Sequence, residues 1–278
     1  MNSRILLIEC VDQKGLIHEV TGVLLRSGQN IISNSEFVDQ ETNTFFMRTE
    51  FEGEDKTDAI RAELQSILPK EAILRFPNRE KRRIVILATK EHHCLGDLLL
   101  RHAYHEINGS LLAVISNHPG LEPLVKRFDI PFQLISHEGK TREEHESELL
   151  SALKAYDPEY IVLAKYMRIL SPEFIAQFPR RIINIHHSFL PAFVGASPYR
   201  QAFQRGVKII GATAHFVTEQ LDEGPIISQN VIPVDHTYTV EGMVQAGRDV
   251  EKRVLANALK LVFEERVFLC GKRTVIFS

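Results

Sequence analysis

The chain has 278 residues, of which 44% are hydrophobic and 25% charged, and its formal net charge at pH 7 is −3. This length predicts about two domains, and the small negative charge argues against a nucleic-acid partner. The sequence shows neither a signal-peptide pattern nor a run of about 18 apolar residues, so we expect no membrane segment.

Six elements are predicted in the first part of the chain from apolar periodicity and turn residues. They follow the order strand, helix, strand, strand, helix, strand, over residues 4–11, 16–28, 30–38, 44–52, 57–68 and 72–76. Gly28 stands where the first helix should end, and Thr57 is a plausible N-cap of the second. This βαββαβ order predicts a compact ferredoxin-like domain.

A break follows at residues 77–83, which read Pro-Asn-Arg-Glu-Lys-Arg-Arg. Proline, asparagine and a charge run between two apolar segments favour a linker, although the same charges would also suit a solvated strand entry. We therefore expect a first domain over residues 1–78 and a second over residues 83–278.

Strands and helices alternate in the second domain. Strands are expected at 84–88, 110–116, 132–135, 160–164 and 182–186, and helices at 95–105, 121–128 and 142–156. Such alternation predicts a Rossmann-like α/β domain with a mostly parallel sheet and helices on both faces. Two longer strands at 209–217 and 226–234 are expected to be antiparallel, and residues 240–263 form a long terminal helix.

Cys10, Cys94 and Cys270 are odd in number, far apart, and form no Cys-x-x-Cys pair. Separated cysteines of this kind favour free thiols over a disulfide framework. We therefore expect a cytoplasmic protein.

Polar side chains interrupt the apolar strands near residues 182–222. Because side chains alternate along a strand, Asn184 and His186 should share one face, and His187 the other. His215 lies on the next predicted strand, and Asp222 lies in the loop after it. Any one of these residues alone could be structural. Together, at the ends of neighbouring strands, they favour a catalytic site for acyl-group chemistry.

Two rival chemistries are weaker. Adjacent histidines such as His186 and His187 point to opposite faces of a strand, and no His-x-x-x-His spacing accompanies them, so we expect no metal. Ser188 and Cys94 are candidate nucleophiles, but neither lies in a Gly-x-Ser-x-Gly elbow.

These motifs resemble the folate-dependent formyltransferase superfamily. The matching segments are NIHHSFLP at 184–191, GATAH at 211–215, LDEGPII at 221–227 and MRILSP at 167–172. The last of these looks like the folate-contacting loop of that superfamily. The resemblance extends from about residue 83 to the end of the chain.

Within the superfamily the resemblance is closest to the formyltetrahydrofolate deformylases. It is carried by KEHHCLGDLL at 90–99, NHP at 117–119 and PAFVGA at 191–196. The first domain, with CVDQKGL at 10–16, resembles an ACT domain, which the deformylases have and the glycinamide ribonucleotide formyltransferases lack. The transferases hold a phosphate with a glycine-rich first βα loop. Here residues 89–95 contain no glycine, which favours water as the formyl acceptor.

The resemblance implies hydrolysis of 10-formyltetrahydrofolate to tetrahydrofolate and formate, which would balance one-carbon folate pools and supply formate for purine synthesis. It implies Asn184 and His186 as hydrogen-bond donors to the formyl oxygen, Asp222 as the group that orients or deprotonates water, and His215 as its support. The folate would contact Met167, Arg168, Ile169 and Leu170. No cofactor is implied, since folate is the substrate.

An ACT domain further implies a homo-oligomer and an amino-acid effector site, although a purely oligomerising module is equally open. The implied effector residues are Asp12, Gly15, Leu16, Ile17 and Asn30. Two alternatives to the hydrolase remain: a formyltransferase acting on an amine acceptor, and a non-catalytic folate or amino-acid sensor.

Overall fold

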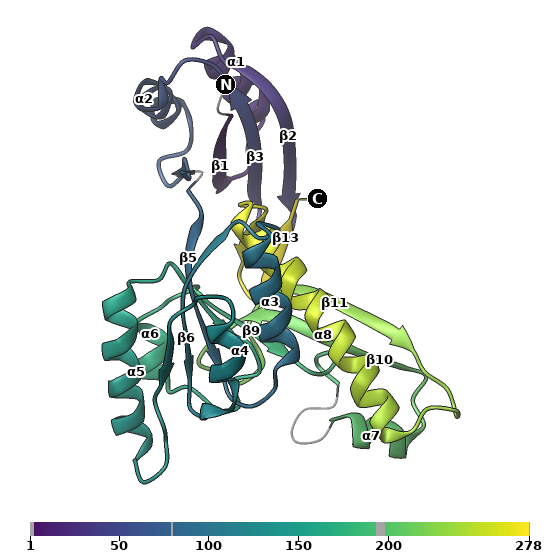
Figure 1. The fold of residues 1–278 in the computed structure, drawn as a ribbon. Coiled ribbons are helices and arrows are strands. Elements are labelled where there is room, and N and C mark those ends of the chain that lie inside the picture. The colour runs from purple at the N-terminus through teal and green to yellow at the C-terminus, as the bar shows by residue number, and fades with distance from the viewer. Residues whose placement is uncertain (1–2, 79, 193–197, 278) are drawn as a thin grey trace. The chain divides into compact units, whose positions relative to one another are not determined.

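The computed structural model describes residues 3–78, 80–192 and 198–277 (Figure 1). Its internal contacts divide the chain into two compact units. One comprises residues up to Glu80 together with Glu265–Cys270 and the residues from Val275 onward, and the other comprises Lys81–Glu264 and Gly271–Thr274. No helix in the described residues is long and apolar enough to cross a membrane.

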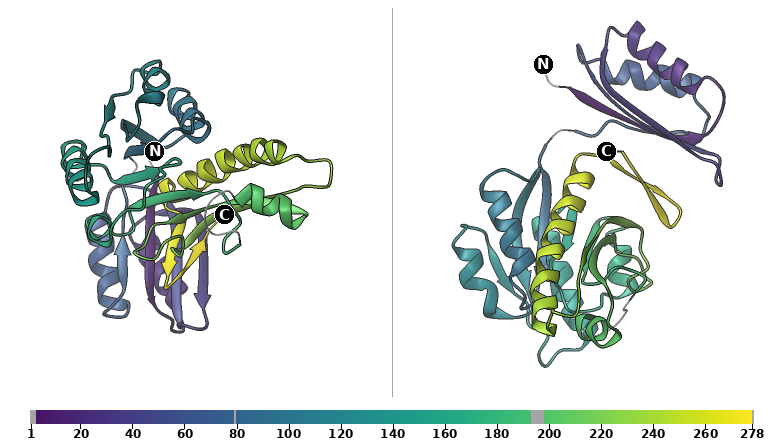
Figure 2. Two further views of the ribbon diagram at one scale, coloured as in Figure 1. Left: turned by 90° about the horizontal axis from the view of Figure 1, so that it is seen from below. Right: turned by 90° about the vertical axis from the view of Figure 1, so that its right-hand side faces the viewer.

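The first unit has the predicted βαββαβ order. Its elements are β1 (Arg4–Val11), α1 (Leu16–Arg26), β2 (Asn30–Asp39), β3 (Thr44–Glu52), α2 (Thr57–Ile67) and β4 (Ile73–Arg75). The four strands form one antiparallel sheet in the order β2-β3-β1-β4. The two helices lie together on one face of this sheet (Figure 2) and enclose a core with Leu6, Ile8 and Phe51. Thr57 is the first residue of α2 and not its cap; its amide donates to Asp55.

The other face of this sheet is covered by the end of the chain. β12 (Val267–Cys270) and β13 (Arg273–Ile276) pair with each other. Phe268 and Phe277 pack with Ile5, Leu7 and Phe46 in a second small core. A division at the linker alone, as expected from the sequence, therefore differs from the observed packing, in which these last residues group with the first unit.

The second unit is built on a seven-stranded sheet in the order β11-β10-β9-β8-β5-β6-β7. The strands are β5 (Arg82–Ala88), β6 (Gly109–Ser116), β7 (Phe132–Leu134), β8 (Tyr160–Leu163), β9 (Ile182–His186), β10 (Ile209–Phe216) and β11 (Ile226–Pro233). Strands β5 to β9 are parallel, while β10 runs antiparallel to both β9 and β11. The expected fold class, an ACT-like domain followed by a mostly parallel α/β sheet, is confirmed.

Helices cover both faces of the large sheet (Figure 1). They are α3 (His93–Ala103), α4 (Glu122–Lys126), α5 (Arg142–Tyr156), α6 (Pro172–Ala176), α7 (Pro198–Arg205) and α8 (Val240–Phe263), with a short 3₁₀ turn η1 (Pro119–Leu121) before α4. α5 and α6 share a core with Leu87, Leu163 and Ile182, whereas α8 packs on β9, β10, β11 and α3.

The arrangement of β5, β8 and β9 determines where the site lies. These three strands are neighbours and parallel, so their carboxyl ends open at the same edge of the sheet. Ligands of open α/β sheets bind at this edge. It brings together the segments that follow Ala88, Leu163 and His186.

Candidate active site

Asn184 and His215 face each other across two antiparallel strands. They are register partners of β9 and β10, and Asn184 Nδ2 lies 3.2 Å from His215 Nε2. His215 Nδ1 lies 2.9 Å from the carbonyl oxygen of Phe216, which can only accept, so the proton belongs on Nδ1. With the proton on Nδ1, Nε2 accepts from Asn184 Nδ2. His215 therefore orients the amide of Asn184.

Asp222 joins these residues from the loop after β10. Its backbone has φ of 57°, a conformation that aspartate and asparagine tolerate better than most residues. The loop passes close to the end of β10 at Gly224. A Cβ there would collide with the carbonyl oxygen of Phe216, so this position requires glycine. The loop places Asp222 Oδ2 3.2 Å from His186 Nδ1.

The histidines around Asp222 keep its carboxyl ionised. Burial raises the pKa of the Asp222 carboxyl, but the hydrogen bond and charge of His186, with a smaller contribution from His215, outweigh burial and leave the pKa well below its usual range. The contact with His215 is the weaker one, because Asp222 Oδ1 lies 3.7 Å from His215 Nε2, beyond hydrogen-bond length. Asp222 is therefore ionised at neutral pH and aligned mainly by His186.

One ring nitrogen of His186 contacts Asp222, and the other has no partner among the described residues. Its Nδ1 faces Asp222, while Nε2 is buried and has no hydrogen-bond partner in the described part of the chain. Buried polar atoms are normally satisfied, so an unpartnered one marks a place where a ligand or water binds. The structure thus brings all four predicted catalytic residues together, with His186 Nε2 and Asn184 beside one another on one strand.

His187 differs from the expectation of opposite faces. β9 ends at His186, so strict alternation stops there, and the two imidazole rings lie 5.1 Å apart between centroids at 30°. Burial, followed by the charge of Lys165, lowers the pKa of His187 to about 4. His187 is therefore neutral at physiological pH.

The two candidate nucleophiles are committed elsewhere. Ser188 donates its hydroxyl to the carbonyl oxygen of Ala192 over 2.7 Å, which closes the turn after β9. Burial raises the pKa of the Cys94 thiol well above its usual value, so this group stays protonated. Neither side chain is activated for attack.

The predicted folate segment, residues 167–170, follows β8. Its residues differ in how far they are buried. Met167 and Ile169 are 59% and 61% exposed, although they are large apolar side chains. Leu170 instead belongs to the core under α5 and α6. Arg168 lines the cavity described next. Two exposed apolar side chains of this kind suit an apolar ring system.

A cavity of about 540 Å³ adjoins these residues. Its walls include Met167 and Arg168 from the folate segment, His187 after β9, and side chains of the β5–α3 loop, α7 and α8. The volume lies within the range of small-molecule sites, roughly 300–1,000 Å³.

Comparison with known proteins identifies the family. A formyl transferase family model matches residues 82–259, and an ACT domain model matches residues 4–69. A formyltetrahydrofolate deformylase of Escherichia coli (strain K12) is 56% identical over 276 residues, 99% of this chain and 99% of that protein. The chain belongs to the formyltetrahydrofolate deformylase family.

Solved structures agree with this family assignment. The crystal structure of a formyltetrahydrofolate deformylase from Pseudomonas syringae pv. tomato has a TM-score of 0.94 and 38% identity, and covers 100% of this chain and 95% of that chain. A glycinamide ribonucleotide transformylase from Symbiobacterium toebii has a TM-score of 0.68 and 34% identity, and covers 74% of this chain and 98% of that chain. Of the motif at 191–196 that resembles the deformylases, residues 193–196 lie outside the described residues.

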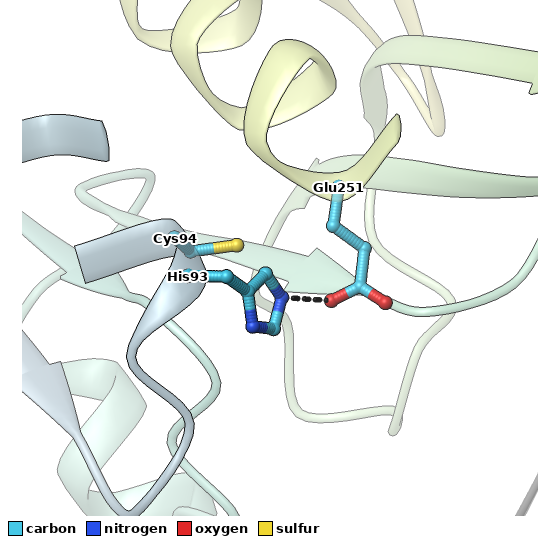
Figure 3. Close-up of side chains that lie close together, drawn as sticks. All are labelled: His93, Cys94 and Glu251. Atoms are coloured by element: carbon cyan, nitrogen blue, oxygen red, sulfur yellow. Dashed lines mark hydrogen bonds and ion pairs between the residues drawn. The ribbon is translucent and has the colours of Figure 1, made fainter. Parts of the chain in front are cut away.

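A buried charged cluster in this deformylase-family chain escaped sequence analysis. Glu251 of α8 is 1% exposed, yet it accepts a hydrogen bond from the Tyr199 hydroxyl over 2.7 Å. It accepts another from His93 Nε2 over 2.8 Å, which Figure 3 shows. Lys165 Nζ lies 3.2 Å from the same carboxylate. The signal in the sequence was faint: Glu251 stands inside the apolar stripe of the terminal helix, between Val250 and Val254.

His93, Cys94 and Glu251 have ligand atoms within 4.8 Å of one another, the only such group among the described residues (Figure 3). A cation there would have to displace the Lys165 ammonium from Glu251 and ionise a thiol whose pKa burial raises. These contacts favour an internal ion-pair cluster over a metal centre.

We expect Glu251→Gln to lower the free energy of unfolding by about 3 kcal/mol at pH 7, since it leaves Lys165 buried without its counter-ion. Burial raises the pKa of Glu251, but hydrogen bonds and charge from His93, Lys165 and Tyr199 lower it to about 2. A carboxyl whose pKa is lowered by folding stabilises the folded state at pH values above its unfolded pKa. This contribution is lost as the pH falls. The difference in free energy of unfolding between wild type and variant, measured by urea titration, should therefore shrink between about pH 5 and about pH 2.

Glu241→Gln, in the exposed first turn of the same helix, is the matched control and should cost under about 1 kcal/mol. An equal loss in both variants, or a difference that grows in acid, would show that the Glu251 cluster does not stabilise the fold in this way.

The first unit has a cavity of its own, of about 420 Å³, at the turn between β1 and α1. Four of the predicted effector residues line it, together with part of β2: Asp12, Gly15, Leu16 and Ile17. Asn30 does not line it, because it begins β2 whereas the cavity uses Glu36–Val38 farther along that strand. The Asn30 side chain instead donates to Glu52 over 3.3 Å.

Proposed function

We propose that this chain hydrolyses 10-formyltetrahydrofolate to tetrahydrofolate and formate. The observation that carries the proposal is the group formed by Asn184, His186 and Asp222 at the carboxyl end of β9 in a chain of the deformylase family. An amide donor, an imidazole with a free nitrogen and an ionised carboxylate are the groups that acyl hydrolysis needs.

In the proposed reaction, the formyl oxygen lies between Asn184 Nδ2 and His186 Nε2. Both groups donate hydrogen bonds to it, and protonated His186 adds a positive charge. These donors stabilise the negative charge that develops when water attacks, and one such donor is typically worth about 10²–10³ in rate. His215 Nε2 accepts from Asn184 Nδ2 and keeps its amide turned toward the substrate.

Asp222 has two roles in this proposal. It holds the His186 ring through Nδ1 and orients the attacking water. The water oxygen bonds to the formyl carbon, the C–N10 bond breaks, and N10 takes up the proton that the water loses. Because its pKa is held low, Asp222 accepts that proton only as the tetrahedral centre forms. The folate is consumed as substrate and no separate cofactor is required.

The decisive experiment follows formate release from 10-formyltetrahydrofolate with and without an amine acceptor. We expect formate in equal amount in both reactions, with ¹⁸O from labelled water in the formate. Glycinamide ribonucleotide should not divert the formyl group. Formylated ribonucleotide in place of formate would support the transferase alternative, and folate binding without either product would support the sensor alternative.

We also propose that the cavity of the first unit binds a small amino acid, whose ammonium group would meet Asp12 or Glu36. Calorimetric titration of the full-length chain with the common amino acids should give saturable binding by at least one of them, weakened by Asp12→Asn. Asp58→Asn in the first turn of α2 is the control and should bind normally. Absence of binding by every amino acid would leave this unit the purely oligomerising role.

A further inference from the structure

Four cationic side chains line the cavity beside His187, together with the carboxylates of Glu91 and Glu251. Lys90, Lys165, Arg168 and Arg248 line it, and the first turn of α3 contributes His93. Cationic side chains beside a helix N-terminus normally make a site for phosphate or carboxylate groups. By position and charge, this cavity has the elements of an anion site.

Two of these four cations, however, are already paired with carboxylates. Arg248 Nη2 lies 2.8 Å from Glu91 Oε2, and Lys165 Nζ lies 3.2 Å from Glu251. Glu91 comes from the β5–α3 loop and Arg248 from α8, so their ion pair joins two walls of the cavity. The Glu91 carboxylate offsets the charge of this guanidinium and engages its Nη2, which makes Arg248 a weaker partner for a second anion.

Two buried polar atoms on the cavity wall lack hydrogen-bond partners among the described residues. They are His93 Nδ1 and Asn117 Oδ1, in residues that are 8% and 4% exposed. Small polar molecules such as water satisfy atoms of this kind. The wall therefore presents hydrogen-bonding atoms that suit water, while Lys165 and Arg248 are occupied by carboxylates.

We propose that Glu91 is a specificity-determining residue. Its ion pair with Arg248 prevents that guanidinium from binding phosphate groups. A phosphate-bearing amine therefore binds the cavity weakly, and water occupies it instead. The cavity is large enough, at about 540 Å³, to admit such a molecule, so charge and not volume excludes it. This role rests on the proposed hydrolysis, in which water must be the nucleophile.

The test uses inorganic phosphate and the full-length chain without folate, in isothermal titration at low ionic strength. Glu91→Gln leaves Arg248 without its carboxylate and should bind phosphate at least about 10-fold more tightly than wild type, the size expected for a charge-assisted hydrogen bond. The double variant Glu91→Gln/Arg248→Met should lose that gain. Glu91→Ala should reproduce it and replaces Glu91→Gln if that variant fails to fold.

Glu63→Gln is the matched control. Glu63 pairs with Arg26 over 2.7 Å and is 38% exposed, as Glu91 is, but it lies in the first unit. The phosphate affinity of the Glu63→Gln variant should equal that of wild type. Equal affinity in Glu91→Gln and wild type, an equal gain in Glu63→Gln, or a gain that survives Arg248→Met would each overturn the proposal. The formate assay involves no phosphate, so failure of hydrolysis would be seen separately.

Discussion

Asp222→Asn should fold normally and lose about 10²- to 10⁴-fold in kcat/KM for formate release, the range attributed to acid–base groups. Asparagine fits the left-handed backbone at this position (φ of 57°), so the loop geometry should persist. The side chain loses its negative charge, however, and with it the alignment of His186 Nδ1 and the proton acceptor for water. The measurement is steady-state formate release together with a thermal melt of the same preparation.

Glu223→Gln is the control for Asp222→Asn, since Glu223 is the next residue of the same loop and is exposed. It should retain wild-type turnover. Near-normal turnover in Asp222→Asn, with the melt unchanged, would sink the assignment of Asp222.

Asn184→Ala should lower kcat by about 10²- to 10³-fold, the usual effect of removing one donor from a developing oxyanion. Asn184 Nδ2 is held by His215 Nε2, 3.2 Å away, so the amide is already oriented before substrate binds. KM should change much less than kcat, because the hydrogen bond strengthens as charge develops on the formyl oxygen.

Asn230→Ala supplies the comparison, because Asn230 is an exposed amide on β11 of the same sheet. It should keep full activity. Combining Asn184→Ala with Asp222→Asn should cost less than the product of the single losses, since residues that act as one unit are not additive. Independent, multiplicative losses would indicate that the two side chains do not serve the same step.

Much of the fold follows from local patterns. β1, β3 and β9 have the bounds that alternation and turn residues predict, and α8 has those predicted from its apolar stripe. The sequence patterns did not predict the short helices α6 and α7 or the hairpin of β12 and β13. Gly271-Lys272 between those two strands is a two-residue turn with glycine first, and Gly271 has φ of 59°. That signal was present in the sequence and is typical of a hairpin.

The candidate site divides in the same way. Asn184 and His186 could be paired from the sequence, because alternation within one strand fixes their shared face. The link between His93, Lys165 and Glu251 could not, because these residues come from three separate elements and meet only after the sheet and α8 have packed. The same holds for the ion pair of Glu91 and Arg248, which lie 157 residues apart.

The covering of the first sheet by the end of the chain has a consequence for how the protein is made. Phe268 and Phe277 complete the core beside Ile5, Leu7 and Phe46. During synthesis residues 1–80 emerge early, but Phe268 and Phe277 emerge later, after a delay on the order of 10–40 s at about 5–20 residues per second. Until then one apolar face of the newly made sheet stays open to water. Ribosome-bound chains that end before β12 should therefore be the ones that chaperones bind at this face.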